Sequence, residues 1–123
     1  MRLLLVDGSP VSTTLVKRLV PAGVEVETVD RFEEACRTLL DRAPAAVIVN
    51  LSPSALPWRE LQTLCAHRDP PIPVLFESCV FRAPEEAGLA ALSDGSGFLR
   101  IPCPVEEQRE QIQRLVRAAG AEH

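Results

Sequence analysis

The chain has 123 residues, of which 46% are hydrophobic and 24% charged, a composition that suits one domain with a substantial core. Its formal net charge is -4 and its acidic and basic residues are interspersed, so we expect no direct contact with nucleic acid. No apolar run approaches the roughly 20 residues that cross a bilayer, and the first run is too short for a secretory signal. We therefore expect a cytoplasmic protein that does not contact a membrane.

Apolar runs alternate with stretches of helical periodicity along the whole chain. Five runs predict strands, and these are residues 2–6, 24–29, 45–50, 73–77 and 97–101. Five periodic stretches predict helices, and these are residues 10–20, 31–42, 55–67, 84–92 and 104–119. This (βα)5 order predicts an α/β fold, a three-layer sandwich with a parallel five-stranded sheet between helices. We expect one domain over residues 1–119 and a tail over 120–123 that resembles an expression remnant.

Two helix starts carry local signals. Ser9 and Pro10 supply a capping hydroxyl and a first-turn proline for the helix at 10–20. Asp30 precedes the helix at 31–42, and we expect its carboxylate to cap that helix. Both predictions rest on side chains that satisfy the free amide groups of a first helical turn.

Asn50 is the polar residue that ends the third apolar run. Strand ends at the carboxyl edge of a parallel sheet are where α/β folds hold their sites. A carboxylate there can attack phosphorus and help to hold a divalent cation, whereas a carboxamide is neutral and poorly nucleophilic. The sequence therefore predicts that position 50 accepts no phosphoryl group, and we expect no metal ion and no cofactor.

Four segments resemble the receiver domains of two-component response regulators. They occur in the same order and spacing as in that family, at residues 4–10, 26–35, 72–78 and 97–102. The resemblance spans residue 1 to about residue 119. It implies a flavodoxin-like fold with strand order 2-1-3-4-5.

The resemblance also implies a degenerate phosphoacceptor pocket. In the family, two acids end strand 1, an acceptor Asp ends strand 3, a hydroxyl residue ends strand 4 and a Lys follows strand 5. Asp7 matches the first acid and Ser78 matches the hydroxyl. Gly8, Asn50 and Ile101 replace the second acid, the acceptor and the Lys. With one carboxylate left and no Lys, the pocket should bind Mg²⁺ negligibly, and Ile101 should fill the cleft.

An atypical receiver, or pseudo-receiver, is implied by these losses. The resemblance implies a phosphorylation-independent signalling module that is no enzyme and that binds a signalling protein or an effector domain.

Phe98 and Arg100 lie two residues apart on the fifth strand, so they share a face and are candidate partner-binding residues. A homodimer through the face of 84–92, 97–101 and 104–119 is one alternative. A solvated edge charge at Arg100 and an interface around Trp58 are two others.

Cys79 and Cys103 follow the fourth and fifth strands and should lie at the carboxyl edge of the sheet. A thiol-based sensor or a small-ligand site in that cleft is the chemical alternative to a binding module. The four cysteines of the chain form no Cys-x-x-Cys pair and accompany no His cluster, which argues against zinc. Neither thiol has a basic neighbour that would lower its pKa. The simpler interpretation is therefore that Cys79 and Cys103 serve as two unrelated small apolar residues.

Glu77 occupies a strand position where the family usually has a large apolar residue. A charged group on a covered strand costs several kcal/mol unless it is paired. We therefore expect a partner for Glu77 or a tilt of its side chain toward solvent. The sequence does not identify that partner.

Overall fold

A computed structural model describes residues 1–7, 9–51 and 57–120. All five predicted strands are present, to within one residue at each end: β1 (Arg2–Val6), β2 (Glu25–Val29), β3 (Ala46–Asn50), β4 (Val74–Ser78) and β5 (Gly97–Arg100). In the described residues there are four helices: α1 (Pro10–Leu19), α2 (Phe32–Asp41), α3 (Trp58–Ala66) and α4 (Val105–Gly120). None of these is long and apolar enough to cross a membrane.

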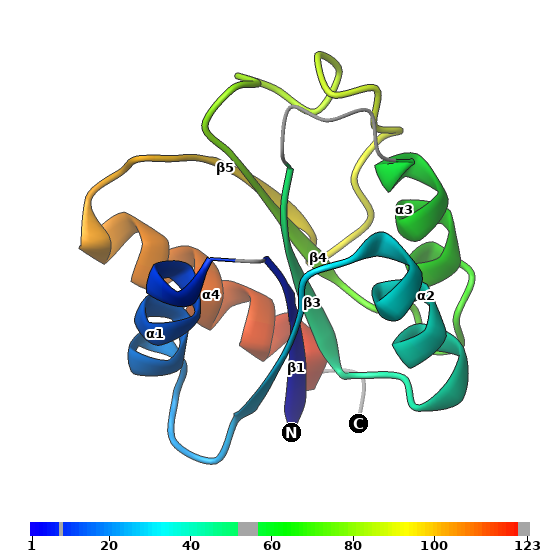
Figure 1. The fold of residues 1–123 in the computed structure, drawn as a ribbon, viewed down its shortest axis with the longest axis horizontal. Coiled ribbons are helices and arrows are strands. Elements are labelled where there is room, and N and C mark those ends of the chain that lie inside the picture. Colours follow the sequence, from blue (N-terminus) through cyan, green and yellow to red (C-terminus); the bar gives the residue numbers. More distant parts are fainter. Residues whose placement is uncertain (8, 52–56, 121–123) are drawn as a thin grey trace.

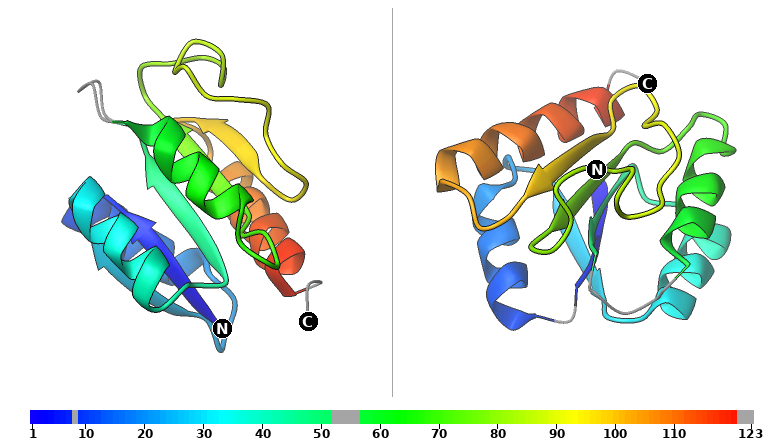
Figure 2. Two further views of the ribbon diagram at one scale, coloured as in Figure 1. Left: turned by 90° about the vertical axis from the view of Figure 1, so that its right-hand side faces the viewer. Right: turned by 90° about the horizontal axis from the view of Figure 1, so that it is seen from above.

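The five strands form one parallel sheet with the order β2-β1-β3-β4-β5, which confirms the predicted topology. Helices α1 and α4 cover one face of the sheet, and α2 and α3 cover the other (Figures 1 and 2). Because all the strands run in the same direction, their carboxyl ends meet along one edge. The register at that edge pairs Asn50 with Glu77 and Ser78 with Arg100.

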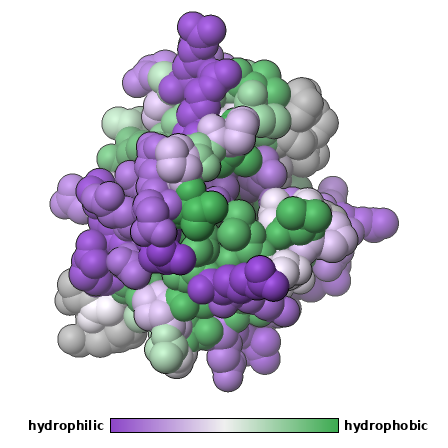
Figure 3. Space-filling view, turned by 90° about the vertical axis from the view of Figure 1, so that its left-hand side faces the viewer, coloured by the Kyte–Doolittle hydropathy of each residue, from purple (hydrophilic) through white to green (hydrophobic). Residues whose placement is uncertain are grey.

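Alternate residues of the strands supply two cores, one on each face of the sheet. In β1, Leu4 belongs to the core under α2 and α3, whereas Leu5 belongs to the core under α1 and α4. Both faces of the central strands are covered, so their residues are apolar without alternation. On the side of α1 and α4, an apolar area is visible between hydrophilic side chains (Figure 3). The partly buried hydrophobic residues of this second core include Leu15, Ile101 and Val116.

The predicted helix at 84–92 is wrong, because residues 84–88 form a turn that does not continue into a helix. That turn ends as helices commonly end, with a glycine in the left-handed region, since Gly88 has φ +76°. The amide of Leu89 donates to the carbonyl of Pro84, and the amide of Gly88 donates to that of Glu85, both at 3.1 Å. Leu89 is then buried in the core under α2 and α3, which prevents the turn from continuing.

Gln62 of α3 also holds this segment in its irregular path. Its side-chain amide donates to the carbonyl of Ala90 at 3.0 Å, and its side-chain carbonyl accepts from the amide of Ala90 at 2.9 Å. The two bonds satisfy both backbone groups of Ala90, as a neighbouring strand would. The segment therefore covers the sheet beside α3, where a helix was predicted (Figure 1).

Replacing Gln62 with Ala should lower the free energy of unfolding by roughly 1 kcal/mol, because two hydrogen bonds at an exposed site are lost. Urea unfolding measures this change. Gln62→Glu is the matched variant, since it keeps the acceptor for the Ala90 amide and loses only the donor. Equal losses for the two variants would show that the acceptor contributes nothing.

One of the two predicted caps is present. The hydroxyl of Ser9 accepts a hydrogen bond from the amide of Ser12 at 3.3 Å, and Pro10 begins α1. The predicted cap by Asp30 is wrong, because Arg31 is the residue before α2 and no side chain caps that helix. The acidic residues Glu33 and Glu34 in the first turn of α2 complement its dipole instead.

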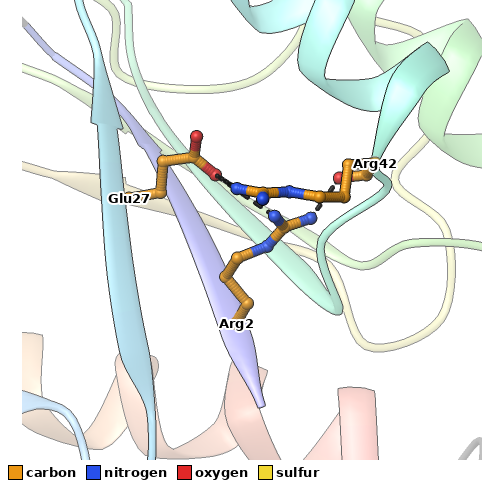
Figure 4. Close-up of polar contacts among 3 residues, drawn as sticks. All are labelled: Arg2, Glu27 and Arg42. Carbon is orange, nitrogen blue, oxygen red and sulfur yellow. Dashed lines mark hydrogen bonds and ion pairs between the residues drawn. The ribbon is translucent and has the colours of Figure 1, made fainter.

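A small ion-pair group ties β1 and β2 to the end of α2 (Figure 4). One carboxylate oxygen of Glu27 lies 3.5 Å from a guanidinium nitrogen of Arg2 and 3.5 Å from one of Arg42. Arg2 also donates to the backbone carbonyl of Arg42. These contacts lie near the start of β1, away from the carboxyl edge of the sheet.

Candidate functional site at the carboxyl edge of the sheet

Asn50 and Asp7 are hydrogen bonded to each other at the ends of β3 and β1. The side-chain amide of Asn50 donates to one carboxylate oxygen of Asp7 at 3.0 Å. The other oxygen of Asp7 accepts from the backbone amide of Ser9 at 2.8 Å. The amide at the acceptor position therefore bonds to the one acid that matches the family, and both oxygens of that acid have donors.

The other three pocket positions lie around this pair in different ways. Ser78 is fully buried, and its hydroxyl accepts from the backbone amides of Val80 at 3.1 Å and Phe81 at 2.8 Å, so it closes the turn after β4. Ile101 is half-buried and packs against the core under α1 and α4. Gly8 lies outside the described residues.

Glu77 is the most buried charged residue of this edge, with 6% of its surface exposed. The side-chain amide of Gln108 in α4 donates to one of its oxygens at 3.5 Å, and the other oxygen is buried without a partner among the described residues. Burial, and then the negative charge of Asp7, raise the pKa of Glu77 from 4.5 to about 7, while the Gln108 hydrogen bond lowers it. We expected either a partner for Glu77 or a tilt of its side chain toward solvent. The structure shows a partner, Gln108, which forms one long hydrogen bond.

These side chains do not fit the magnesium site that the fold family implies. Mg²⁺ needs oxygen ligands that face the ion together. Here the nitrogen of the Asn50 side chain points at Asp7, and Asp7 uses both of its oxygens for protein donors. Among residues 1–7, 9–51 and 57–120, no three His, Cys, Asp or Glu side chains gather as a metal ion would require.

The two thiols of the alternative reading are in different environments. Cys79 is exposed and Cys103 is half-buried, and both are free. Burial raises the pKa of Cys103, and the charges of Glu107 and Glu77 raise it further, which lowers the population of its reactive thiolate. A cavity of about 270 Å³ at this edge has neither thiol in its lining, which is made by Asp7, Ser9, Pro10, Thr13, Thr28, Val29, Asp30 and Glu34.

Phe98 and Arg100 share a face of the edge strand β5, as predicted from their spacing. Phe98 is half-buried and packs against the core under α2 and α3, whereas Arg100 is exposed. Arg100 takes part in none of the ion pairs that join the described residues. Since the helix at 84–92 is absent, the irregular segment between β4 and β5 takes its place beside these residues (Figure 2).

Gln108 is the residue of this edge that sequence reasoning missed. It is 8% exposed, although it lies in a helix with many charged residues. Its position carried a signal, because Gln108, Ile112, Leu115 and Ala119 follow one another at helical spacing and are the buried residues of α4. Val105, by contrast, is exposed, although apolar.

No protein-family model and no curated protein sequence matches the chain. Solved structures match it along almost its whole length. A two-component transcriptional regulator AraC from Clostridium phytofermentans is 15% identical, with 99% of this chain and 97% of that chain covered and a TM-score of 0.77. The receiver domain of a putative LuxO repressor protein from Vibrio parahaemolyticus is 17% identical, with coverages of 98% and 93% and a TM-score of 0.75.

A third structure in this group was solved with an ion in its cleft. It is the receiver domain of a sensor histidine kinase from Pseudomonas aeruginosa, with magnesium coordinated in the active-site cleft. It is 18% identical to this chain, 97% of each chain is covered and the TM-score is 0.72. At such identities the likeness concerns the fold, and this chain has the flavodoxin-like fold of response-regulator receiver domains.

Proposed function

We propose that this chain is a phosphorylation-independent signalling module of the receiver type, which works in the cytoplasm by binding another protein and catalyses no reaction. The observation that carries the proposal is the 3.0 Å hydrogen bond from the Asn50 amide to Asp7. In receiver domains, position 50 would carry the phosphoryl acceptor and position 7 an acid that binds the metal ion. Here a neutral amide at position 50 is hydrogen bonded to the acid at position 7. Both carboxylate oxygens of Asp7 thus accept hydrogen bonds from the protein itself.

Phosphoryl transfer in proteins depends on positioning and on charges that offset those of the phosphoryl oxygens. This edge offers a neutral amide at position 50 and an apolar side chain at Ile101. Glu77 adds a buried acid, which would repel an incoming phosphoryl group when ionised. The arrangement therefore supports a role that depends on the shape of the surface.

The partner surface that we propose is centred on Arg100. It is an exposed guanidinium at the end of an edge strand, beside the half-buried ring of Phe98, and it forms no ion pair with the residues that the structure describes. Arginine and large aromatic residues are common anchors in protein interfaces. A signalling protein or an effector domain with an acidic group facing Arg100 fits this surface, and a second copy of the chain is the alternative occupant.

Arg100→Glu should reduce recovery of the partner at least tenfold in a pull-down with the purified chain as bait, because reversing an anchor charge costs about 2 kcal/mol or more. Arg117→Glu is the matched control, since Arg117 is an exposed arginine near the far end of α4. Thermal unfolding should remain cooperative in both variants.

Phe98→Ala combined with Arg100→Glu should abolish binding. Phe98 also packs against the core, so unfolding of this double variant has to be measured beside binding. If binding survives the double change and is lost when residues around Trp58 are altered, the interface lies elsewhere. Trp58 itself is buried, with its ring edge-on to that of Phe32 at 5.9 Å between centroids.

A further inference from the structure

Among the first seven residues of α4, only Gln108 is buried. Val105, Glu106 and Glu107 are exposed, and the first buried residue of the helix is Gln108. The next buried residue is Ile112, one turn further along. The side chain of Gln108 ends at Glu77, so this polar contact joins the first turn of α4 to β4.

Glu77 lies near the carboxyl end of β4, between β3 and β5. Its register partners are Asn50 on β3 and Leu99 on β5, which are neutral. The titratable groups that act on it or feel its charge are Asp7 at the end of β1 and Cys103 in the loop before α4. It takes part in none of the ion pairs that join the described residues.

The two protonation states of Glu77 require different surroundings. A protonated carboxyl group has one acceptor oxygen free for the Gln108 amide and can stay buried as a neutral group. An ionised carboxylate needs donors at both oxygens. Within the described part of the chain, Glu77 has one donor at 3.5 Å and one oxygen without a partner. A buried charge with so little support is stabilised by admitting water, and displacement of Gln108 with the start of α4 would expose Glu77 to it.

We infer that Glu77 and Gln108 form a proton-operated latch, which holds the first turn of α4 on the sheet while Glu77 is protonated and releases it when Glu77 ionises. The inference concerns the domain alone, so it does not depend on the proposed partner. The raised pKa of Glu77, about 7, places the transition near neutral pH.

The sign of the stability change follows from the direction of the pKa shift. The folded state binds the proton of Glu77 more tightly than the unfolded state, whose carboxyl group has an ordinary pKa. Stability from this group is therefore complete below the unfolded pKa of 4.5, falls as the pH rises from 4.5 to about 7 and is level above that. Glu77→Gln should remove this component of the pH dependence.

The test is carbon-13 and amide NMR of the full chain across neutral pH. The carboxyl carbon of Glu77 should titrate with a midpoint near 7. The amides of residues 105–109 should shift with the same midpoint. The amides of Glu107 and Gln108 donate to the carbonyl of Pro104. Their protection from hydrogen exchange, corrected for the intrinsic rate, should fall about tenfold between roughly pH 6 and roughly pH 8.

Three variants separate the latch from other titrations. Glu77→Gln keeps the shape of the side chain and should leave the start of α4 protected at both pH values. Glu107→Gln is the matched control, because Glu107 is an exposed acid of the same helical turn, and it should behave like the wild type. Asp7→Asn removes the second cause of the shift and should lower the midpoint of Glu77.

Two results would overturn the inference. One is a midpoint for Glu77 close to its ordinary 4.5 in the wild type, since the group would then be ionised throughout the neutral range. The other is a titration of Glu77 near 7 during which the amides of residues 105–109 neither shift nor lose protection. Ionisation of Glu77 would then have no effect on the start of α4. Both are read from the wild-type chain, so neither depends on how a variant folds.

Discussion

Incubation of the wild-type chain with acetyl phosphate and Mg²⁺ should leave its intact mass unchanged. Position 50 carries a carboxamide, which is not a nucleophile toward phosphorus. The acid that is hydrogen bonded to it, Asp7, already accepts two hydrogen bonds from the protein. Mass spectrometry of the intact chain measures the result directly, and a canonical Asp-containing receiver treated in parallel shows that the donor is active.

Asn50→Asp alone should also remain unmodified, because Gly8 and Ile101 still supply neither an acid nor a cation. The change replaces a donor to Asp7 with a second carboxylate, so it should lower the free energy of unfolding by about 1–3 kcal/mol at neutral pH. Addition of one base-labile phosphoryl group to the wild type would contradict the proposed function, since another residue would have to be the acceptor. Addition to Asn50→Asp alone would show that the missing charges are not needed.

Gly95→Ala should destabilise the domain by about 2–4 kcal/mol, the sum of a backbone and a packing cost. Gly95 has φ +82°, where a side chain is strained. A Cβ atom there would lie 2.6 Å from the Cβ of Ala118 in α4, which is too close for two carbon atoms. Chemical denaturation measures the loss, and the turn before β5 should shift away from α4.

Gly23→Ala is the matched control for the backbone part of that cost. Gly23 has φ +89°, and an added Cβ would meet nothing within 4 Å, so its loss should be about 1 kcal/mol. Ala118→Gly in the Gly95→Ala background should recover most of the packing part. Equal losses at Gly23 and Gly95 would show that α4 moves away without cost.

The sequence by itself determined the order of the elements and the character of the site. Continuous apolar runs such as Val47–Val49 identify strands buried on both faces, and amphipathic stretches identify the helices that cover them. These patterns are local, and the parallel topology follows from their alternation. Asn50 could be placed at the carboxyl edge for the same reason, since it ends a strand.

The hydrogen bond between Asn50 and Asp7 required the three-dimensional register. The two residues are 43 positions apart, and the pairing of Val6 with Val49 brings them together at neighbouring strand ends. The sequence shows directly that position 50 carries an amide in place of a carboxylate. That its amide would bond to the remaining acid was visible only in the sheet.

Only the tertiary structure decided the fate of residues 84–92 and of Glu77. The helical pattern at 84–92 was outweighed by contacts with distant parts of the chain, as Leu89 enters the core and Gln62 of α3 binds Ala90. Glu77 meets Gln108 across 31 positions, and its burial depends on how α4 lies on the sheet. Local patterns report the propensity of a segment, whereas the protonation and pairing of a buried group depend on the neighbours that folding brings to it.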